Sequence, residues 1–361
     1  MSEPEPTPPQ TLLQIVAECD NFVVPPSASV SGKAEEEALA SWHLFPDASS
    51  PALGLIRPII LAQLKLETTN SWKFWTHNNV DKVSFADHIK TPKERSSIMK
   101  ELCERWRDQG LWPGQIGPKK WRGEMYPIYR HPFGKLDAPL GSEGNGDDIE
   151  DDSRNYAFRM ERSACALFGT VTYGVHMTVY QDDPEKATRN EQGALENESC
   201  RIWVPKRAKT KQTWPGYLDN SVAGGITCGI TPFECAVKEA MEEASIPEDI
   251  VAKYAKSVGC VSYFYRTNAG WLQPEVEYVF HLRVPLEVQL QLTPLDGEVE
   301  SFECLPLKEV VAKVRSGLFK PNCAIVIIDF LIHQGYLTPE NEPDFLEIMT
   351  RIHGRFGYER W

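Results

Sequence analysis

Three glutamates in the segment AVKEAMEEASIP have the spacing of one side of a helix. Glu239 lies three residues before Glu242 and four residues before Glu243. At about 100° per residue, the three side chains therefore project to the same side of the helix. Like charges at such spacings weaken a helix. A face that is simply solvated is one interpretation of this pattern. The other is a site for a hard cation such as Mg²⁺, which prefers carboxylate oxygens.

The residues before this acidic helix specify where it begins. Thr231 is a good N-cap, Pro232 suits the first helical position, and Glu234 sits at the third. This pattern predicts a helix over residues 232–245. A Gly-Gly pair at residues 224–225 precedes the helix, so we expect the carboxylates to lie beside a glycine loop. Carboxylates beside such a loop would give a hard cation an oxygen-rich site, but helix composition alone does not favour this site over a solvated face.

The whole segment from Gly224 to Ile246, GGITCGITPFECAVKEAMEEASI, resembles the Nudix box. Besides Gly224, the positions that match this pattern in register are Glu239, Ala240, Glu242, Glu243 and Ile246. Three positions depart from it, where the family has Glu, Arg and Gly: Ile230, Lys238 and Ser245. Glu234 is a candidate substitute for the first of these glutamates. Its alternative role is to cap the helix together with Thr231.

This resemblance implies an α/β fold, namely a Nudix α/β/α sandwich with a mixed sheet, preceded by a smaller α+β companion domain. We expect a disordered, Pro-rich tail over residues 1–10, the companion domain over residues 11–158 and the Nudix domain over residues 159–361. Two polar segments are expected to be surface loops, the acidic residues 141–153 and the insertion at residues 181–199.

Other segments predict individual elements. Thr91, Pro92 and Glu94 indicate a capping box followed by a helix. The β-branched and aromatic run over residues 165–180 predicts a strand. The N-terminal region is rich in tryptophan. We therefore expect it to pack on the Nudix domain and to complete the organic end of a substrate site, since ligand sites often lie between domains.

Several further stretches, among them DGEVESFECLPL, are similar to the thiamine pyrophosphokinase-related Nudix proteins of fungi and plants. That resemblance implies a Mg²⁺-dependent hydrolase, with Mn²⁺ as an alternative metal. The implied reaction removes the terminal phosphate of thiamine diphosphate, or of its oxidised and damaged analogues, and leaves the monophosphate. Two alternatives remain open: a phosphatase for 8-oxo-dGDP-type nucleoside diphosphates, and a non-catalytic module that senses a cofactor.

The resemblance also implies roles for single residues. Glu239, Glu242 and Glu243 are expected to bind the metal, and one of them or an outside carboxylate such as Glu298 acts on the attacking water. The basic stretch WVPKRAKTK fits a diphosphate tail. The expected substrate-binding residues are Trp203, Arg207, Lys209, Lys211, Gly224 and Gly225. The basic residues also fit a solvated face or a nuclear-localisation run, and Trp203 also fits the protein core.

Composition limits the partners and the location. The net charge of −13 argues against nucleic acid and anionic membranes, and no run approaches the roughly 20 apolar residues of a membrane span. The nine cysteines form no Cys-x-x-Cys pair, and the N-terminus MSEPEPTPPQ does not resemble a signal peptide. These features predict a cytoplasmic protein with reduced thiols. We expect a small-molecule diphosphate as partner; the oligomeric state is not indicated.

Overall fold

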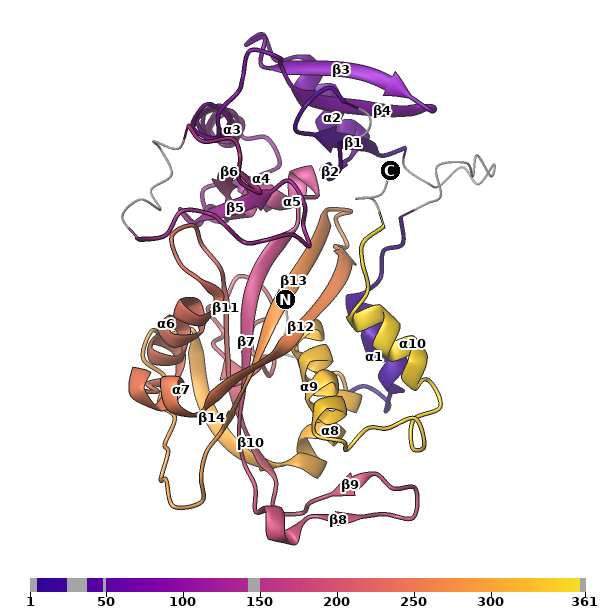
Figure 1. Ribbon diagram of the computed structural model, residues 1–361, viewed down its shortest axis with the longest axis vertical. Coiled ribbons are helices and arrows are strands. Elements are labelled where there is room, and N and C mark those ends of the chain that lie inside the picture. The colour runs from indigo at the N-terminus through magenta and orange to yellow at the C-terminus, as the bar shows by residue number, and fades with distance from the viewer. Residues whose placement is uncertain (1–4, 25–37, 48–49, 142–149, 358–361) are drawn as a thin grey trace.

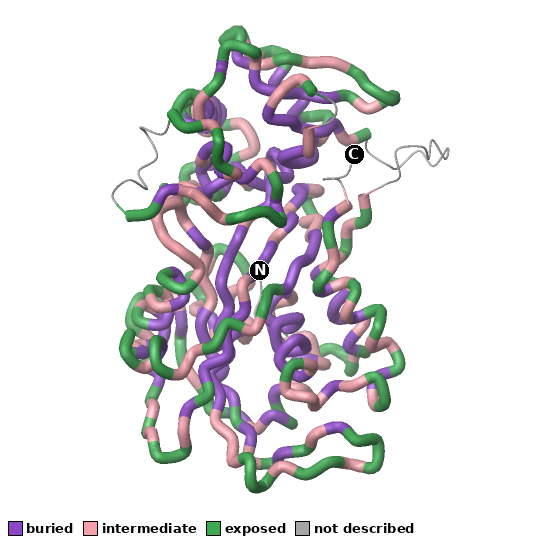
Figure 2. The backbone as a smooth tube through the Cα atoms, viewed as in Figure 1, coloured by how far each residue is buried: buried purple, intermediate pink, exposed green. Residues whose placement is uncertain are grey.

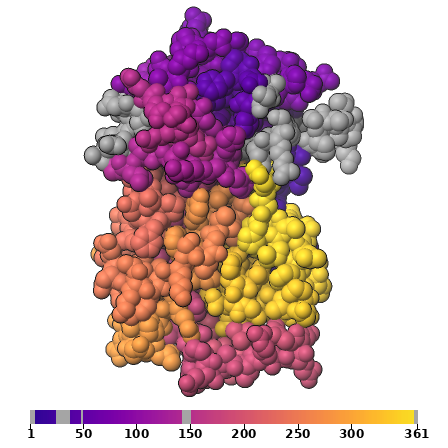
Figure 3. All heavy atoms as spheres, viewed as in Figure 1, coloured from indigo at the N-terminus to yellow at the C-terminus, as the bar shows by residue number. Residues whose placement is uncertain are grey.

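The computed structural model describes residues 5–24, 38–47, 50–141 and 150–357, and it has two units stacked along its long axis (Figure 1). We call the described part of residues 38–168 the N-terminal unit, and the remaining described residues the C-terminal unit. The atoms of the two units meet directly (Figure 3). The amide of Cys228 donates to the carbonyl of Met125 at 2.9 Å, which fixes the loop before the acidic helix to the N-terminal unit.

The N-terminal unit contains a four-stranded sheet in the order β2-β1-β4-β3. The strands β1 and β4 are parallel, and the other pairs are antiparallel. Its core is aromatic, and Trp42 and Trp106 are fully buried in it. The elements of this unit are β1 (Ala40–His43), β2 (Ala52–Ile56), α2 (Pro58–Lys65), β3 (Trp72–His77), β4 (Val80–Phe85), α3 (Pro92–Asp108), α4 (Pro113–Ile116), β5 (Met125–Tyr129), β6 (Tyr156–Glu161) and α5 (Cys165–Phe168).

The C-terminal unit is built on a six-stranded sheet in the order β12-β13-β7-β10-β14, with β11 paired to β7. The sheet is mixed, because β7 and β13 are parallel whereas the other pairs are antiparallel. Its strands are β7 (Thr172–Gln181), β10 (Arg201–Arg207), β11 (Val222–Gly225), β12 (Ala255–Arg266), β13 (Leu272–Arg283) and β14 (Val299–Pro306).

Helices cover both faces of this sheet (Figure 1). Val175 and Met177 of β7 pack in one hydrophobic cluster with residues of α6, and Ile202 and Val204 of β10 pack in another with residues of α9. The central strands are correspondingly buried (Figure 2). The predicted α/β/α sandwich with a mixed sheet is therefore confirmed. The helices are α6 (Pro232–Ala244) and α7 (Glu248–Tyr254) on one face, and α1 (Leu12–Cys19), α8 (Leu307–Arg315), α9 (Pro321–His333) and α10 (Phe345–Ile352) on the other.

A split in the sheet provides room for a site. The strand β10 pairs with β7 only at Arg201 and Ile202, and β11 then takes its place beside β7 from Val222 to Gly225. The two strands β10 and β11 therefore diverge. The glycines at the end of β11 lie at this opening, directly before the loop that leads into α6.

Several contacts in the structure cross the predicted boundaries. The helix α1 belongs to the C-terminal unit, because its buried residues pack in the same cluster as α9. The predicted tail is partly ordered, since the amides of Thr7 and Gln10 donate to the carbonyls of Ser316 and Arg315 at 2.9 Å each. The expected boundary after residue 158 falls inside β6, which pairs with β5.

Single segments also differ in part from what the sequence predicts. Cys165–Phe168, at the start of the predicted strand, is the short helix α5, and Gly169 ends it in the left-handed conformation with a φ of 55°. The insertion at residues 181–199 contains a small hairpin of β8 (Thr188–Arg189) and β9 (Leu195–Glu196). Most of the predicted acidic loop, residues 142–149, lies outside the described residues.

Candidate active site

The acidic helix α6 begins where the sequence predicts. The Glu234 amide donates to Thr231 Oγ1 at 3.2 Å, and the Thr231 amide donates to Glu234 Oε2 at 2.7 Å, which completes a capping box. At the other end, Ser245 stands where the Nudix box has glycine. Its φ of 55° is in the left-handed region, and its hydroxyl donates to the carbonyl of Thr293 at 2.8 Å, which holds the turn in place.

The three predicted glutamates of α6 have different environments. Glu243 is 8% exposed, and its Oε2 accepts a hydrogen bond of 2.9 Å from the Ala223 amide of β11. Burial raises the pKa of Glu243 well above its usual value, and the charge of Asp219 raises it further. Glu239 lies so close to Gly224 that a Cβ atom there would overlap its side chain. This close approach explains the glycine at the first position of the box.

Glu242 is the most exposed of the three. Lys238 donates to Glu242 Oε2 at 2.9 Å and to Glu239 Oε1 at 3.1 Å. Lys238 stands where the Nudix box has arginine, and it still neutralises two carboxylates of the box. It does so with a single ammonium group, not with the paired N–H donors of a guanidinium. Burial raises the pKa of Glu239 despite this lysine.

Two further carboxylates reach Glu243 from the loop before β14. Glu243, Asp296 and Glu298 each offer an oxygen, and these oxygens lie within 4.8 Å of one another. The Asp296 carboxylate accepts the amide of Glu298 at 2.8 Å, which holds the turn, and Lys211 is ion-paired with Glu298. Burial raises the pKa of Glu298, but the hydrogen bond and charge of Lys211, together with the charges of Arg207 and Arg122, outweigh it and the net shift is downward. Three convergent carboxylates fit a hard divalent cation that needs oxygen ligands.

The expected catalytic and metal-binding residues therefore lie around one cavity of about 690 Å³. Glu239, Glu242, Glu243 and Glu298 all line it. Asp296 lines it as well, although the sequence analysis did not propose it. Its position two residues before Glu298, in a turn that brings both carboxylates to one side, could have predicted this.

The expected substrate-binding residues divide into two groups. Residues that line the cavity are Arg207, Lys211, Gly224 and Gly225. Arg207 is already engaged, because it is ion-paired with Asp219 and donates to the carbonyls of Thr213 and Trp214. Trp203 does not line the cavity; it is buried in the hydrophobic core on the α6 side. Lys209 is exposed outside the cavity.

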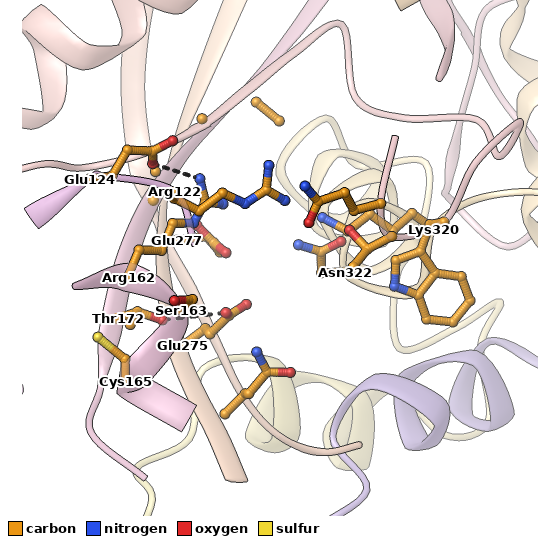
Figure 4. Close-up of a pocket in the computed structure, with 18 of the residues that line it drawn as sticks. Arg122, Glu124, Arg162, Ser163, Cys165, Thr172, Glu275, Glu277, Lys320 and Asn322 are labelled. Carbon is orange, nitrogen blue, oxygen red and sulfur yellow. Dashed lines mark hydrogen bonds and ion pairs between the residues drawn. The ribbon is translucent and has the colours of Figure 1, made fainter. Parts of the chain in front are cut away.

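The N-terminal unit contributes to the same cavity. Gln115, Lys120, Arg122, Glu124 and Tyr126 all line it. Figure 4 shows Arg122 and Arg162 on one side and Lys320 and Asn322 on the other. No local pattern in the sequence marked the N-terminal residues, because their proximity to α6 depends on how the two units pack.

Glu234 does not line the cavity, which supports its role as a cap. We expect Glu234→Ala to lower the free energy of unfolding by about 1 kcal/mol, as for other lost caps, while turnover is retained. Glu94→Ala is a matched control, since Glu94 makes the same capping box with Thr91 in α3. Denaturant unfolding and a turnover assay are the measurements. A loss of turnover in Glu234→Ala but not in Glu94→Ala would show that Glu234 substitutes for the acid missing at Ile230.

Comparison with known proteins assigns the family. The model of the NUDIX domain matches residues 189–322. An uncharacterized protein of Saccharomyces cerevisiae, YJR142W, is 39% identical over 274 residues, which cover 73% of this chain and 69% of that protein. Nudix hydrolase 20, chloroplastic, of Arabidopsis thaliana is 32% identical over 74% of this chain and 60% of its own length.

A bacterial relative also belongs to this family. The uncharacterized Nudix hydrolase lmo0368 of Listeria monocytogenes is 32% identical over 126 residues, which are 35% of this chain and 67% of that protein. The chain belongs to the Nudix hydrolases, a family of phosphoanhydride hydrolases that use divalent metals. Within the described part of the chain, no helix has the length and apolar character needed to cross a membrane.

Proposed function

We propose that this protein is a Mg²⁺-dependent diphosphatase that removes the terminal phosphate of thiamine diphosphate, or of its oxidised and damaged analogues. The observation that carries the proposal is the convergence of Glu243, Asp296 and Glu298 at the end of β11. Water attacks the terminal phosphorus, the bond from that phosphorus to the bridging oxygen breaks, and the products are the monophosphate, inorganic phosphate and a proton.

The residues of this chain have distinct roles in the proposed reaction. Glu243, Asp296 and Glu298 would hold the metal, with Glu242 at the exposed edge of the site. When bound, Mg²⁺ neutralises diphosphate oxygens and lowers the pKa of water. Glu239, whose pKa burial raises, orients the attacking water and takes its proton. Lys211 and Arg122 line the cavity and attract the diphosphate.

The cellular setting is part of the proposal. All nine cysteines are free thiols, which supports a reducing, cytoplasmic location. A role in clearing damaged cofactors is consistent with a cavity that has room beyond the diphosphate site.

The test is phosphate release by the full chain with thiamine diphosphate, oxythiamine diphosphate, 8-oxo-dGDP and ADP. We expect Mg²⁺-dependent release, fastest with one of the two thiamine compounds, and none in excess EDTA. Mn²⁺ serves as a second metal. Preference for 8-oxo-dGDP would replace the thiamine assignment. Tight binding without release would instead favour a non-catalytic sensing module.

A further inference from the structure

The cavity has a second polar end on the other face of the sheet. Glu275 and Glu277 project from β13 on the same side, two residues apart, and both line the cavity. The Tyr263 hydroxyl contacts both, at 3.0 Å from Glu277 Oε1 and closer still to Glu275. Asn322 Nδ2 donates to the same hydroxyl oxygen at 3.0 Å. Figure 4 shows the two carboxylates between Thr172 and Asn322.

The hydrogen bonds around this pair leave acceptor capacity unused. A phenol has one proton, so Tyr263 donates to only one of the two carboxylates at a time. Thr172 donates to Glu275 at 3.3 Å. Of the basic side chains near the pair, His176 lies within ion-pair distance, 3.7 Å from Glu277. Burial raises the pKa of Glu275 and the charge of Glu277 raises it further, whereas the charges of Lys320 and Arg162 lower it. Burial also opposes ionisation of Glu277, but His176, Lys320 and the Tyr263 hydrogen bond together outweigh it and lower its pKa.

A second observation comes from the N-terminal unit. Tyr126 is 3% exposed, and its hydroxyl has no hydrogen-bond partner among the described residues. Leaving a buried hydroxyl unpaired costs about 1–3 kcal/mol, and such groups are uncommon unless a ligand or water completes them. Arg162 does not fill this role, because it stacks over the Tyr126 ring at 5.2 Å and donates to Glu124 at 2.9 Å.

Two glycines keep the floor between these groups open. Gly225 of β11 is opposite Gly174 of β7, and Gly174 is opposite Glu277 of β13. A Cβ atom on Gly225 would overlap the Tyr126 hydroxyl, and one on Gly174 would overlap the Glu277 carboxylate. Tyr126 and Glu277 thus approach the backbone on the neighbouring strands β11 and β7, one strand spacing apart, roughly 5 Å. One polar group of a ligand can therefore reach both side chains.

We infer that Tyr126, Glu275 and Glu277 bind the organic end of the substrate and select a positively charged heterocycle that carries N–H groups. This inference rests on the proposed function, in which the diphosphate lies at the carboxylates of α6. The carboxylate pair accepts hydrogen bonds from the N–H groups and balances the positive charge. The Tyr126 hydroxyl supplies the remaining polar contact. The N-terminal unit thereby contributes to specificity through a residue that touches the ligand.

The test uses the full chain in EDTA, so that neither metal nor turnover is involved. Binding of thiamine, which is cationic and has no phosphate, is compared with binding of adenosine, which is neutral. We expect Glu275→Gln to weaken thiamine relative to adenosine by at least about tenfold. Glu303→Gln, an exposed acid of β14, is the control and keeps the wild-type ratio.

Tyr126→Phe separates ligand binding from folding. If the hydroxyl has no other task, its removal does not lower the melting temperature, and we expect thiamine binding to weaken all the same. An unchanged ratio of thiamine to adenosine affinity in both variants overturns the inference, and so does wild-type protein that binds adenosine as tightly as thiamine. Normal thiamine binding without Mg²⁺-dependent phosphate release would overturn the proposed function alone.

Discussion

Glu243→Gln is expected to lower turnover at least about a hundredfold, the scale of a positioned catalytic group. Glu243 is the one residue of α6 that shares the carboxylate cluster with Asp296 and Glu298. Glutamine keeps the size of the side chain and an oxygen that can accept the Ala223 amide, but it removes the charge that the cation requires. The metal-free variant should be at least as stable as the wild type, because a buried carboxylate is costly to ionise.

Phosphate release and thermal unfolding with and without Mg²⁺ measure these effects. Stabilisation by Mg²⁺ should largely disappear in Glu243→Gln, since a bound ligand stabilises the folded state by mass action. Glu248→Gln is the control, an exposed acid in the first turn of α7. Glu242→Gln should also lose turnover, but less, because Glu242 is half-exposed and paired with Lys238. Full Mg²⁺-dependent turnover in Glu243→Gln would mean that the acidic face of α6 is merely solvated.

The local features of this site could be predicted from the sequence. The start of α6 depends on Thr231, Pro232 and Glu234, which are neighbours in the chain, and the structure has the expected capping box. The carboxylates at spacings of three and four also reach the cavity as expected. In both cases the interactions are set by residues less than two helical turns apart, so the periodicity alone contains the information.

Features that depend on distant contacts could not be predicted in this way. Asp296 reaches Glu243 through the pairing of β14 with β10, and Tyr126 reaches Gly225 through the packing of the two units. For Trp203 the sequence left two interpretations open, ligand stacking beside a basic stretch and burial in the core, and the structure places its side chain in the core. The short helix α5 was missed because its apolar residues have no period that separates a buried helix from a strand.

The place of α1 in the fold depends on distant contacts as well, and its removal is expected to abolish folding. The helix α1 buries Leu12, Ile15, Val16 and Cys19, against a cluster that includes α8, α9 and α10. Its C-cap residue, Asp20, is ion-paired with Arg351 at 3.1 Å. Full burial of an aliphatic side chain contributes about 1.5–3 kcal/mol, so loss of α1 removes an amount comparable to the roughly 5–15 kcal/mol by which domains are stable.

We therefore expect a chain that starts at Arg159 to lack a cooperative unfolding transition, even though it contains the whole Nudix box. A chain that starts at Cys200 should fail for the further reason that it lacks β7, the strand in the middle of the sheet. Leu12→Ala in the full chain tests the same packing with a smaller loss of stability. It should lower the free energy of unfolding by about 2–5 kcal/mol, as for other buried leucines. Leu13→Ala is the matched control, because Leu13 is next in the same helix and only partly buried. Denaturant unfolding followed by circular dichroism measures all of these chains. Equal losses in the two leucine variants, or a cooperative transition in the shortened chains, would show that α1 is an appendage rather than part of the core. If α1 is part of the core, the catalytic domain of this protein begins near its N-terminus, is interrupted by the N-terminal unit, and resumes at β7, so the unit that carries Tyr126 is held to the catalytic domain by the chain at both of its ends.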